Sequence, residues 1–194
     1  EGEIHIENLE GRAVVFPMPY FTAEQNVCKC LLALDNAPLK PVSTNVDHLI
    51  SATENETGIN LSENQKYAVK ASVQNGVSVI TGGPGTGKTT IINTIIKIFE
   101  HSGFATAIAA PTGRAAKRIT ETSGYEASTI HRLLEYYYSE GEDTMRFGKT
   151  GEDPLQYDAV IIDEASMIDI LLMNGLLSAI KPFLAWERET CCGI

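Results

Sequence analysis

The sequence is poor in cysteine and in positive charge. It holds four cysteines among 194 residues, and its 15 lysines and arginines face 25 acidic residues, for a net charge of -10. Cys28 and Cys30 lie two residues apart in an expected helix, and Cys191 and Cys192 are adjacent, so neither pair has the spacing of a zinc site. We expect free thiols. The negative charge argues against nucleic-acid binding over the whole surface, but it leaves room for a local basic groove.

Long apolar runs are absent too. No stretch approaches the roughly 18 apolar residues that a membrane-spanning helix needs. The N-terminal segment, residues 1–10, is acidic and polar, unlike a secretory signal. Hydrophobic residues make up 43% of the chain and charged residues 21%, which are ordinary values for a protein with a packed core. These features predict a soluble, cytoplasmic protein with no membrane partner.

Residues 1–55 are expected to form a small N-terminal segment and a linker. Residues 1–20 indicate short extended pieces interrupted by prolines, which confine a strand to a sheet edge. An apolar stripe at helical spacing predicts a helix capped by Thr22 and ending before Pro38. Residues 36–59 are rich in Asn, Pro, Ser, Thr and Gly, which is typical of a linker, although residues 46–51 could form a short helix within it.

Residues 56–182 alternate between expected strands and helices. The strands are 77–81, 104–110 and 157–163, and the helices are 61–76, 87–103, 112–124, 128–137 and 167–180. Ser62 is expected to cap the first of these helices. Strands separated by helices imply a parallel sheet with right-handed crossovers. The predicted fold class is therefore α/β, with helices covering both faces of the sheet.

A phosphate-binding pattern lies between an expected strand and an expected helix. Gly82, Gly87, Lys88 and Thr89 fit the spacing G-x-x-x-x-G-K-[ST] of a P-loop. Glycines let backbone N–H groups approach phosphate oxygens, and the helix N-terminus adds a partial positive charge. Lys88 would reach the outer phosphates, and the Thr89 hydroxyl would ligate magnesium. The alternative is an ordinary glycine-rich turn.

A pair of carboxylates follows the last expected strand. Asp163 and Glu164 come directly after four apolar residues, at the edge of a parallel sheet where ligands bind. Asp163 would hold magnesium, and Glu164 would orient or deprotonate the attacking water. This pairing favours hydrolysis over transfer to another substrate. The alternative is a strand-end turn that caps the next helix.

The densest basic segment runs from Arg114 through Lys117 and Arg118 to Arg132. Hydroxyls, basic side chains and helix N-termini are the groups that contact a phosphate backbone, although a solvated helix face is an equally good interpretation. The three consecutive tyrosines at 136–138 could stack on bases or pack on the domain.

Four segments in order resemble the motifs of superfamily-1 DNA helicases, most closely the RecD-like group that includes the alpha subunit of exodeoxyribonuclease V. These segments are 79–90, 107–121, 127–134 and 157–169. Residues 61–69 resemble the glutamine motif of that family, and residues 14–34 resemble the segment that precedes its motor domain.

The resemblance implies a RecA-like motor domain and ATP-dependent, magnesium-dependent 5′-to-3′ movement on single-stranded DNA, in DNA recombination and repair. Other subunits of a helicase–nuclease complex are candidate partners. By position, Gln65 would recognise adenine. The implied phosphate and magnesium residues are Gly83, Gly85, Gly87, Lys88, Thr89, Thr90 and Asp163, with Glu164 catalytic as above. The implied DNA contacts are Pro111, Thr112, Arg114, Thr129 and His131; His131 could equally be a buried core residue.

The family pattern is lost after residue 182. The resemblance calls for a further strand and a second RecA-like domain with an arginine finger, whereas residues 183–194 form an atypical tail. We therefore expect the front part of a helicase, weakly active or inactive alone, with a tail that is foreign to it. Three other classes stay open: a non-motor P-loop switch with a protein partner, a small-molecule kinase, and a noncatalytic DNA-binding module. The scarcity of basic residues after Lys149 argues against the kinase.

Overall fold

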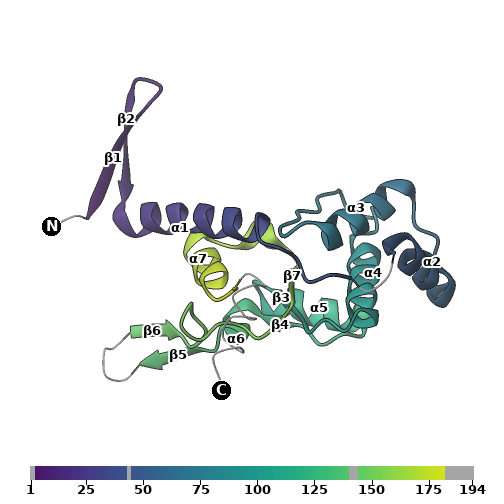
Figure 1. Cartoon of the computed structure of the whole chain (residues 1–194). Coiled ribbons are helices and arrows are strands. Elements are labelled where there is room, and N and C mark those ends of the chain that lie inside the picture. Colours follow the sequence, from purple (N-terminus) through teal and green to yellow (C-terminus); the bar gives the residue numbers. More distant parts are fainter. Residues whose placement is uncertain (1–2, 43–44, 140–143, 182–194) are drawn as a thin grey trace, which may run out of the picture.

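The N-terminus forms a hairpin that leads into a long helix. The computed structural model describes residues 3–42, 45–139 and 144–181, so the expected tail at 183–194 lies outside the described residues. Strand β1 (Ile4–Leu9) pairs antiparallel with β2 (Arg12–Pro17), and α1 (Met18–Asp35) follows at once (Figure 1). The predicted cap at Thr22 is wrong, because a proline in the first turn suits a helix start and lets α1 begin at Met18.

Helix α1 is hydrogen-bonded to the last helix that the structure describes. The side-chain amide of Asn26 donates to Asn174 Oδ1 at 2.6 Å and to Ser178 Oγ at 3.1 Å. Both acceptors belong to α7 (Ile170–Ser178), which lies beside α1 in Figure 1. Polar contacts therefore join two helices that are distant in the sequence.

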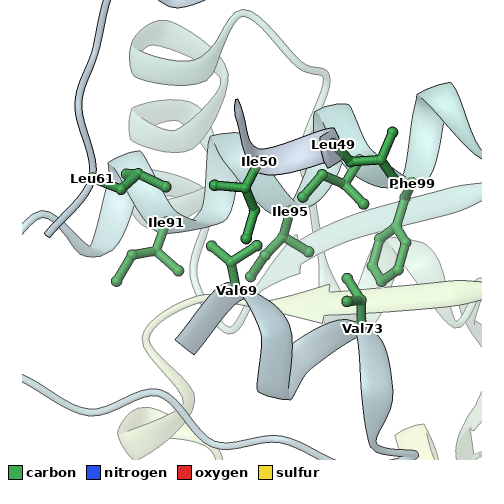
Figure 2. Packing of buried hydrophobic residues seen from close by; sticks show 9 residues of the cluster. Leu49, Ile50, Leu61, Val69, Val73, Ile91, Ile95 and Phe99 are labelled. Atoms are coloured by element: carbon green, nitrogen blue, oxygen red, sulfur yellow. The ribbon is translucent and has the colours of Figure 1, made fainter. Parts of the chain in front are cut away.

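A helix occupies much of the expected linker. Helix α2 (Val46–Thr57) begins where Asn45 Oδ1 accepts the N–H of Asp47 at 2.8 Å. Its residues Leu49 and Ile50 are buried against α3 (Glu63–Gln74) and α4 (Lys88–His101), as Figure 2 shows. The short helix expected at 46–51 is therefore present and extends to Thr57, so the linker prediction is wrong over these residues. The boundary expected at residue 55 falls inside α2.

A parallel three-stranded sheet forms the centre of the domain. Its order is β4 (Ser128–Thr129), β3 (Thr106–Ala110), β7 (Ala159–Ile162). Ile108 and Ala110 pack against α4 and α5 (Gly113–Ser123), whereas Ala109 packs on the other face with α6 (Ile130–Leu133) and α7. Helices therefore cover both faces, and the predicted α/β class is confirmed.

Residues 77–81 do not form the expected buried strand. Val79 is 87% exposed, although Ile80 packs on the core shared by α2, α3 and α4. A strand is stabilised by hydrogen bonds to a neighbour. Among the described residues, no strand pairs with this segment. Its apolar composition alone therefore does not make it a strand.

The expected helix at 128–137 is replaced by a short helix and a hairpin. Helix α6 ends at Leu133, and β5 (Tyr136–Ser139) pairs antiparallel with β6 (Thr144–Phe147). Aromatic residues favour the extended conformation, and Glu135 turns the chain at a φ of 53°. No helix in the described part of the chain is both long and apolar enough to cross a membrane.

We expect two apolar truncations to destabilise the fold by very different amounts. Ile98 is fully buried in α4, so Ile98→Ala should lower the free energy of unfolding by about 2–5 kcal/mol through lost contacts and a cavity. Val79→Ala should change it by less than about 0.5 kcal/mol, because the side chain is exposed. Urea unfolding measures both, and a large loss at Val79 would show that residues 77–81 are buried after all.

Candidate nucleotide site

Helix α4, which directly follows the P-loop, packs on β3 of the central sheet. Near the end of α4, the ring of Phe99 stacks on Phe104, with centroids 5.0 Å apart, just before β3 begins. The C-terminal end of α4 therefore lies at the amino end of β3. A helix of 14 residues is about 21 Å long. Ile92, nearer the start of α4, packs on the cluster that contains Ile108 and Ala110 of β3, so the helix lies alongside this strand.

The P-loop has the backbone conformation that its glycines permit. Gly85 and Gly87 have φ values of 75° and 81°, which side-chain-bearing residues rarely adopt. Gly87 precedes α4 and offers no side chain to its first turn, so those N–H groups remain available to an anion. Lys88 Nζ donates to the carbonyls of Gly82 at 2.5 Å and Gly83 at 2.8 Å. The lysine thus lies across its own loop.

The two hydroxyls after Lys88 lie in the first turn of α4. Thr89 is exposed and Thr90 is half-buried. No cluster of three or more His, Cys, Asp or Glu side chains in the described ranges could hold a metal by itself. A hydroxyl and one carboxylate are nevertheless the hard oxygen donors that Mg²⁺ uses beside phosphate oxygens. Thr89 and Asp163 fit that donor set.

Gln65 joins the start of α3 to the P-loop. Its Oε1 accepts the N–H of Ser62 at 2.8 Å, and Ser62 Oγ accepts the N–H of Gln65, so the two form a capping box. Its Nε2 donates to the carbonyl of Thr86 at 3.1 Å. The same amide fills the space that a Cβ on residue 87 would need. The family resemblance implies that Gln65 binds adenine, which stays a prediction, and the Ser62 cap was expected from the sequence; the contact of Gln65 with the P-loop was not predicted.

A charged contact fixes the segment that leads to this cap. Glu54 Oε1 accepts the N–H of Leu61 at 2.7 Å and lies 3.3 Å from Lys66 Nζ. The backbone N–H of Leu61, followed by Lys66, holds the pKa of the Glu54 carboxyl below its ordinary value. Glu54 therefore connects α2 to the start of α3 while it is ionised.

The two carboxylates after β7 have different surroundings. Asp163 is half-buried; its N–H donates to the carbonyl of Ala109 at 3.0 Å and continues the ladder with β3. Its Oδ1 accepts the N–H of Glu164 at 2.9 Å. Glu164 has a φ of 53°, a conformation that costs energy in a residue with a side chain and is common at functional sites. Its carboxylate lies 3.9 Å from NH1 of Arg118.

The residues expected to contact DNA follow β3 and β4. Thr112 Oγ1 accepts the N–H of Ala115 at 3.2 Å, and Thr129 Oγ1 accepts that of Arg132 at 3.1 Å. Both hydroxyls thus cap helices. Ala110 pairs with Thr129, so the two caps lie side by side with Pro111 between β3 and the first of them.

The remaining predicted DNA contacts divide into exposed and packed side chains. Arg114 is exposed and has no acidic partner among the described residues. His131 is half-buried, with its ring centroid 5.1 Å from that of Tyr136. Tyr136 in turn packs on Phe147 at 5.1 Å, whereas Tyr137 and Tyr138 are 49% and 52% exposed. His131 and Tyr136 therefore contact each other, although Tyr136 is still 40% exposed, and the DNA contact expected of His131 stays a prediction.

A glycine-rich turn at a helix start and an acidic pair on a parallel strand define the class: a RecA-like α/β P-loop domain. The chain belongs to the AAA domain family, which matches residues 65–185. The resemblance to RecD-like helicases is confirmed by curated relatives.

The ATP-dependent RecD2 DNA helicase of Deinococcus radiodurans is 40% identical over 122 residues, covering 63% of this chain and 16% of the relative. The RecBCD enzyme subunit RecD of Mycolicibacterium smegmatis is 32% identical over 186 residues, covering 84% of this chain and 32% of the relative. An uncharacterized protein of Methanocaldococcus jannaschii is 39% identical over 127 residues, covering 60% and 11%. The chain thus spans at most about a third of these relatives.

Substitution of Gln65 should separate its cap from its brace on the P-loop. Gln65→Glu keeps an oxygen for the N–H of Ser62 but loses the donor to Thr86, so nucleotide affinity should fall roughly tenfold while stability changes by less than about 0.5 kcal/mol. Gln65→Ala should also cost about 1 kcal/mol of stability. Titration with a fluorescent ATP analogue and urea unfolding measure the two effects. Wild-type affinity in Gln65→Glu would refute the brace.

The ionised Glu54 should make part of the stability pH-dependent. Because its folded pKa is lowered, its contribution is present at neutral pH and is lost as the pH falls through the folded value. Glu54→Gln should therefore lower the melting temperature at pH 7, with a difference that shrinks below roughly pH 4. Glu126→Gln, at an exposed loop position, is the control. If Glu54→Gln lowers the melting temperature equally at pH 7 and below roughly pH 4, this account is wrong.

Proposed function

We propose that this chain is the ATP-binding motor domain of an ATP-dependent DNA helicase that moves 5′ to 3′ on single-stranded DNA. The observations that support the proposal are a P-loop with Gly85 and Gly87 at positive φ before α4 and an acidic pair that follows the parallel strand β7. The P-loop at the start of α4 and Asp163 after β7 suit a magnesium-bound triphosphate. The start of α5, after β3, offers a capped helix and basic side chains suited to a phosphate backbone.

The chain's own groups supply binding and orientation. Lys88 would exchange the carbonyls of Gly82 and Gly83 for the outer phosphate oxygens, a stronger charge-assisted contact. Bound Mg²⁺ would neutralise charge on the phosphates, held by the Thr89 hydroxyl and Asp163. Glu164 would orient or deprotonate the water that attacks the terminal phosphate. The first-turn N–H groups of α4 would complete the cradle.

DNA would bind across the adjacent ends of β3 and β4. The exposed Arg114 and the neighbouring Thr112 and Thr129 would contact sugar and phosphate groups of the single strand. The names of the relatives support this assignment, since one is a DNA helicase and another is a subunit of the RecBCD enzyme. A cytoplasmic role in recombination and repair, with other subunits of such a complex, is part of the proposal.

Turnover by residues 1–194 alone should be slow. The family resemblance implies that a second RecA-like domain supplies an arginine finger, a group typically worth about 10³–10⁵ in rate. Strong nucleotide binding with weak hydrolysis is therefore the expected behaviour of this chain.

The central test is a nucleotide titration of wild type and Lys88→Ala, with and without oligo-dT. Loss of charge-assisted phosphate contacts should weaken ATP binding by roughly ten- to a hundredfold in Lys88→Ala. Lys97→Ala, on the same helix but paired with Glu56, should bind like wild type.

The same titration separates the alternatives. Oligo-dT should raise ATP turnover of the wild type, since a motor couples the two sites. Turnover that ignores oligo-dT would instead support a nucleotide-dependent switch with a protein partner. DNA binding without any nucleotide binding would support a noncatalytic module. Duplex unwinding by this chain alone would show that no second domain is needed.

A further inference from the structure

One ion pair joins the two halves of the candidate site. Arg118 NH1 lies 3.9 Å from Glu164 Oε1, with side chains 74% and 44% exposed. Arg118 belongs to α5, the helix that follows β3, whereas Glu164 follows β7, the neighbouring strand of the sheet. The contact thus runs from the basic helix to the carboxylate assigned to the attacking water.

Arg118 is placed on the same face of α5 as Arg114. The two residues are four apart, so they are neighbours along the helix surface. Lys117 points elsewhere and lies 3.7 Å from Glu121, one turn further along the same helix. The described residues offer Arg118 one carboxylate within ion-pair distance, and it is Glu164.

We propose that Arg118 is a positioning residue that holds Glu164 toward α5 until single-stranded DNA takes its place. This inference rests on the proposed function, since it assigns a regulation to the same site. A phosphate of the DNA backbone would compete with the Glu164 carboxylate for the guanidinium, which binds both anions in the same bidentate way. Release of Arg118 would free Glu164 to face the water near the terminal phosphate.

The backbone of Glu164 is held more firmly than its side chain, so the carboxylate is the part that can change position. Its φ of 53° is unfavourable for a side-chain-bearing residue, and its backbone N–H donates to Asp163 Oδ1. The backbone N–H is therefore held by Asp163, while the exposed carboxylate has a single ion-pair contact, at 3.9 Å, with Arg118. A change of rotamer is enough to redirect the carboxylate.

A nucleotide-free binding cycle tests the competition. Fluorescence anisotropy with labelled oligo-dT gives the DNA affinity of wild type, Arg118→Gln, Glu164→Gln and the double variant. If Glu164 competes for Arg118, Glu164→Gln should tighten DNA binding by about two- to fivefold, the range of an exposed ion pair. That gain should disappear in the Arg118→Gln background.

Glu121→Gln is the matched control, because it removes one negative charge from α5 near Lys117 rather than Arg118. Its effect on DNA affinity should be the same in both backgrounds. An equal gain from Glu164→Gln in both backgrounds would overturn the proposal, since general electrostatics would then explain it. Failure of the wild type to bind oligo-dT would overturn it as well.

ATP hydrolysis without DNA gives a second readout. Arg118→Gln should raise the basal rate and reduce stimulation by oligo-dT, Arg118→Lys should restore part of the restraint, and Lys117→Gln should match wild type. An unchanged basal rate in Arg118→Gln contradicts the restraint. Absence of ATP binding in the wild type would instead end the proposed function, while the DNA cycle would still decide whether Arg118 and Glu164 compete with the strand.

Discussion

The parallel pairing of β3 with β7 is the constraint on which the candidate site depends. The register runs from Thr106 opposite Ala159 to Ala109 opposite Ile162, and the N–H of Asp163 extends it to the carbonyl of Ala109. Successive side chains of a strand point to opposite faces, so a slip by one residue would turn Asp163 away from the side that it now faces. The alternate burial of Ile108 and Ala109 on the two sheet faces opposes such a slip. Core packing therefore sets the direction of the acidic side chain.

Many of the candidate ligand groups already have structural partners. Lys88 donates to its own loop, Gln65 braces that loop, and Thr112 and Thr129 cap helices. Binding at this edge would thus exchange internal hydrogen bonds for contacts to phosphate, and the net gain would be smaller than the new contacts alone suggest. A hydroxyl that caps a helix keeps a second lone pair and its proton, so capping and DNA contact are compatible. Lys88 has three N–H donors and uses two of them within its own loop, so the third can contact phosphate before the other two are exchanged.

The sequence predicted the parts of this site that depend on local chemistry. The glycine spacing before Lys88, the apolar residues before Asp163 and the Ser62 cap each have a cause within a few residues. The fold class followed from the alternation of expected strands and helices. The buried strand at 77–81 was wrong because a strand also needs a partner, which sequence periodicity does not supply. Helix α2 was expected only as a short helix over 46–51, because the polar residues after Ser51 obscure its continuation to Thr57. The contact of Arg118 with Glu164 depends on tertiary placement, because the two residues are 46 positions apart in the chain.

The weakness of the pair between Arg118 and Glu164 suits it to a switch. An exposed ion pair is worth about 0–1 kcal/mol, because water and salt screen both charges. A buried pair would cost several kcal/mol to separate, and a DNA phosphate at a solvated edge could not repay that. The exposed pair instead lies within the range of one phosphate contact. Since the net charge of the chain is -10, a strand would be drawn only to local cationic sites such as Arg114 and Arg118, and its arrival there would act directly on Glu164.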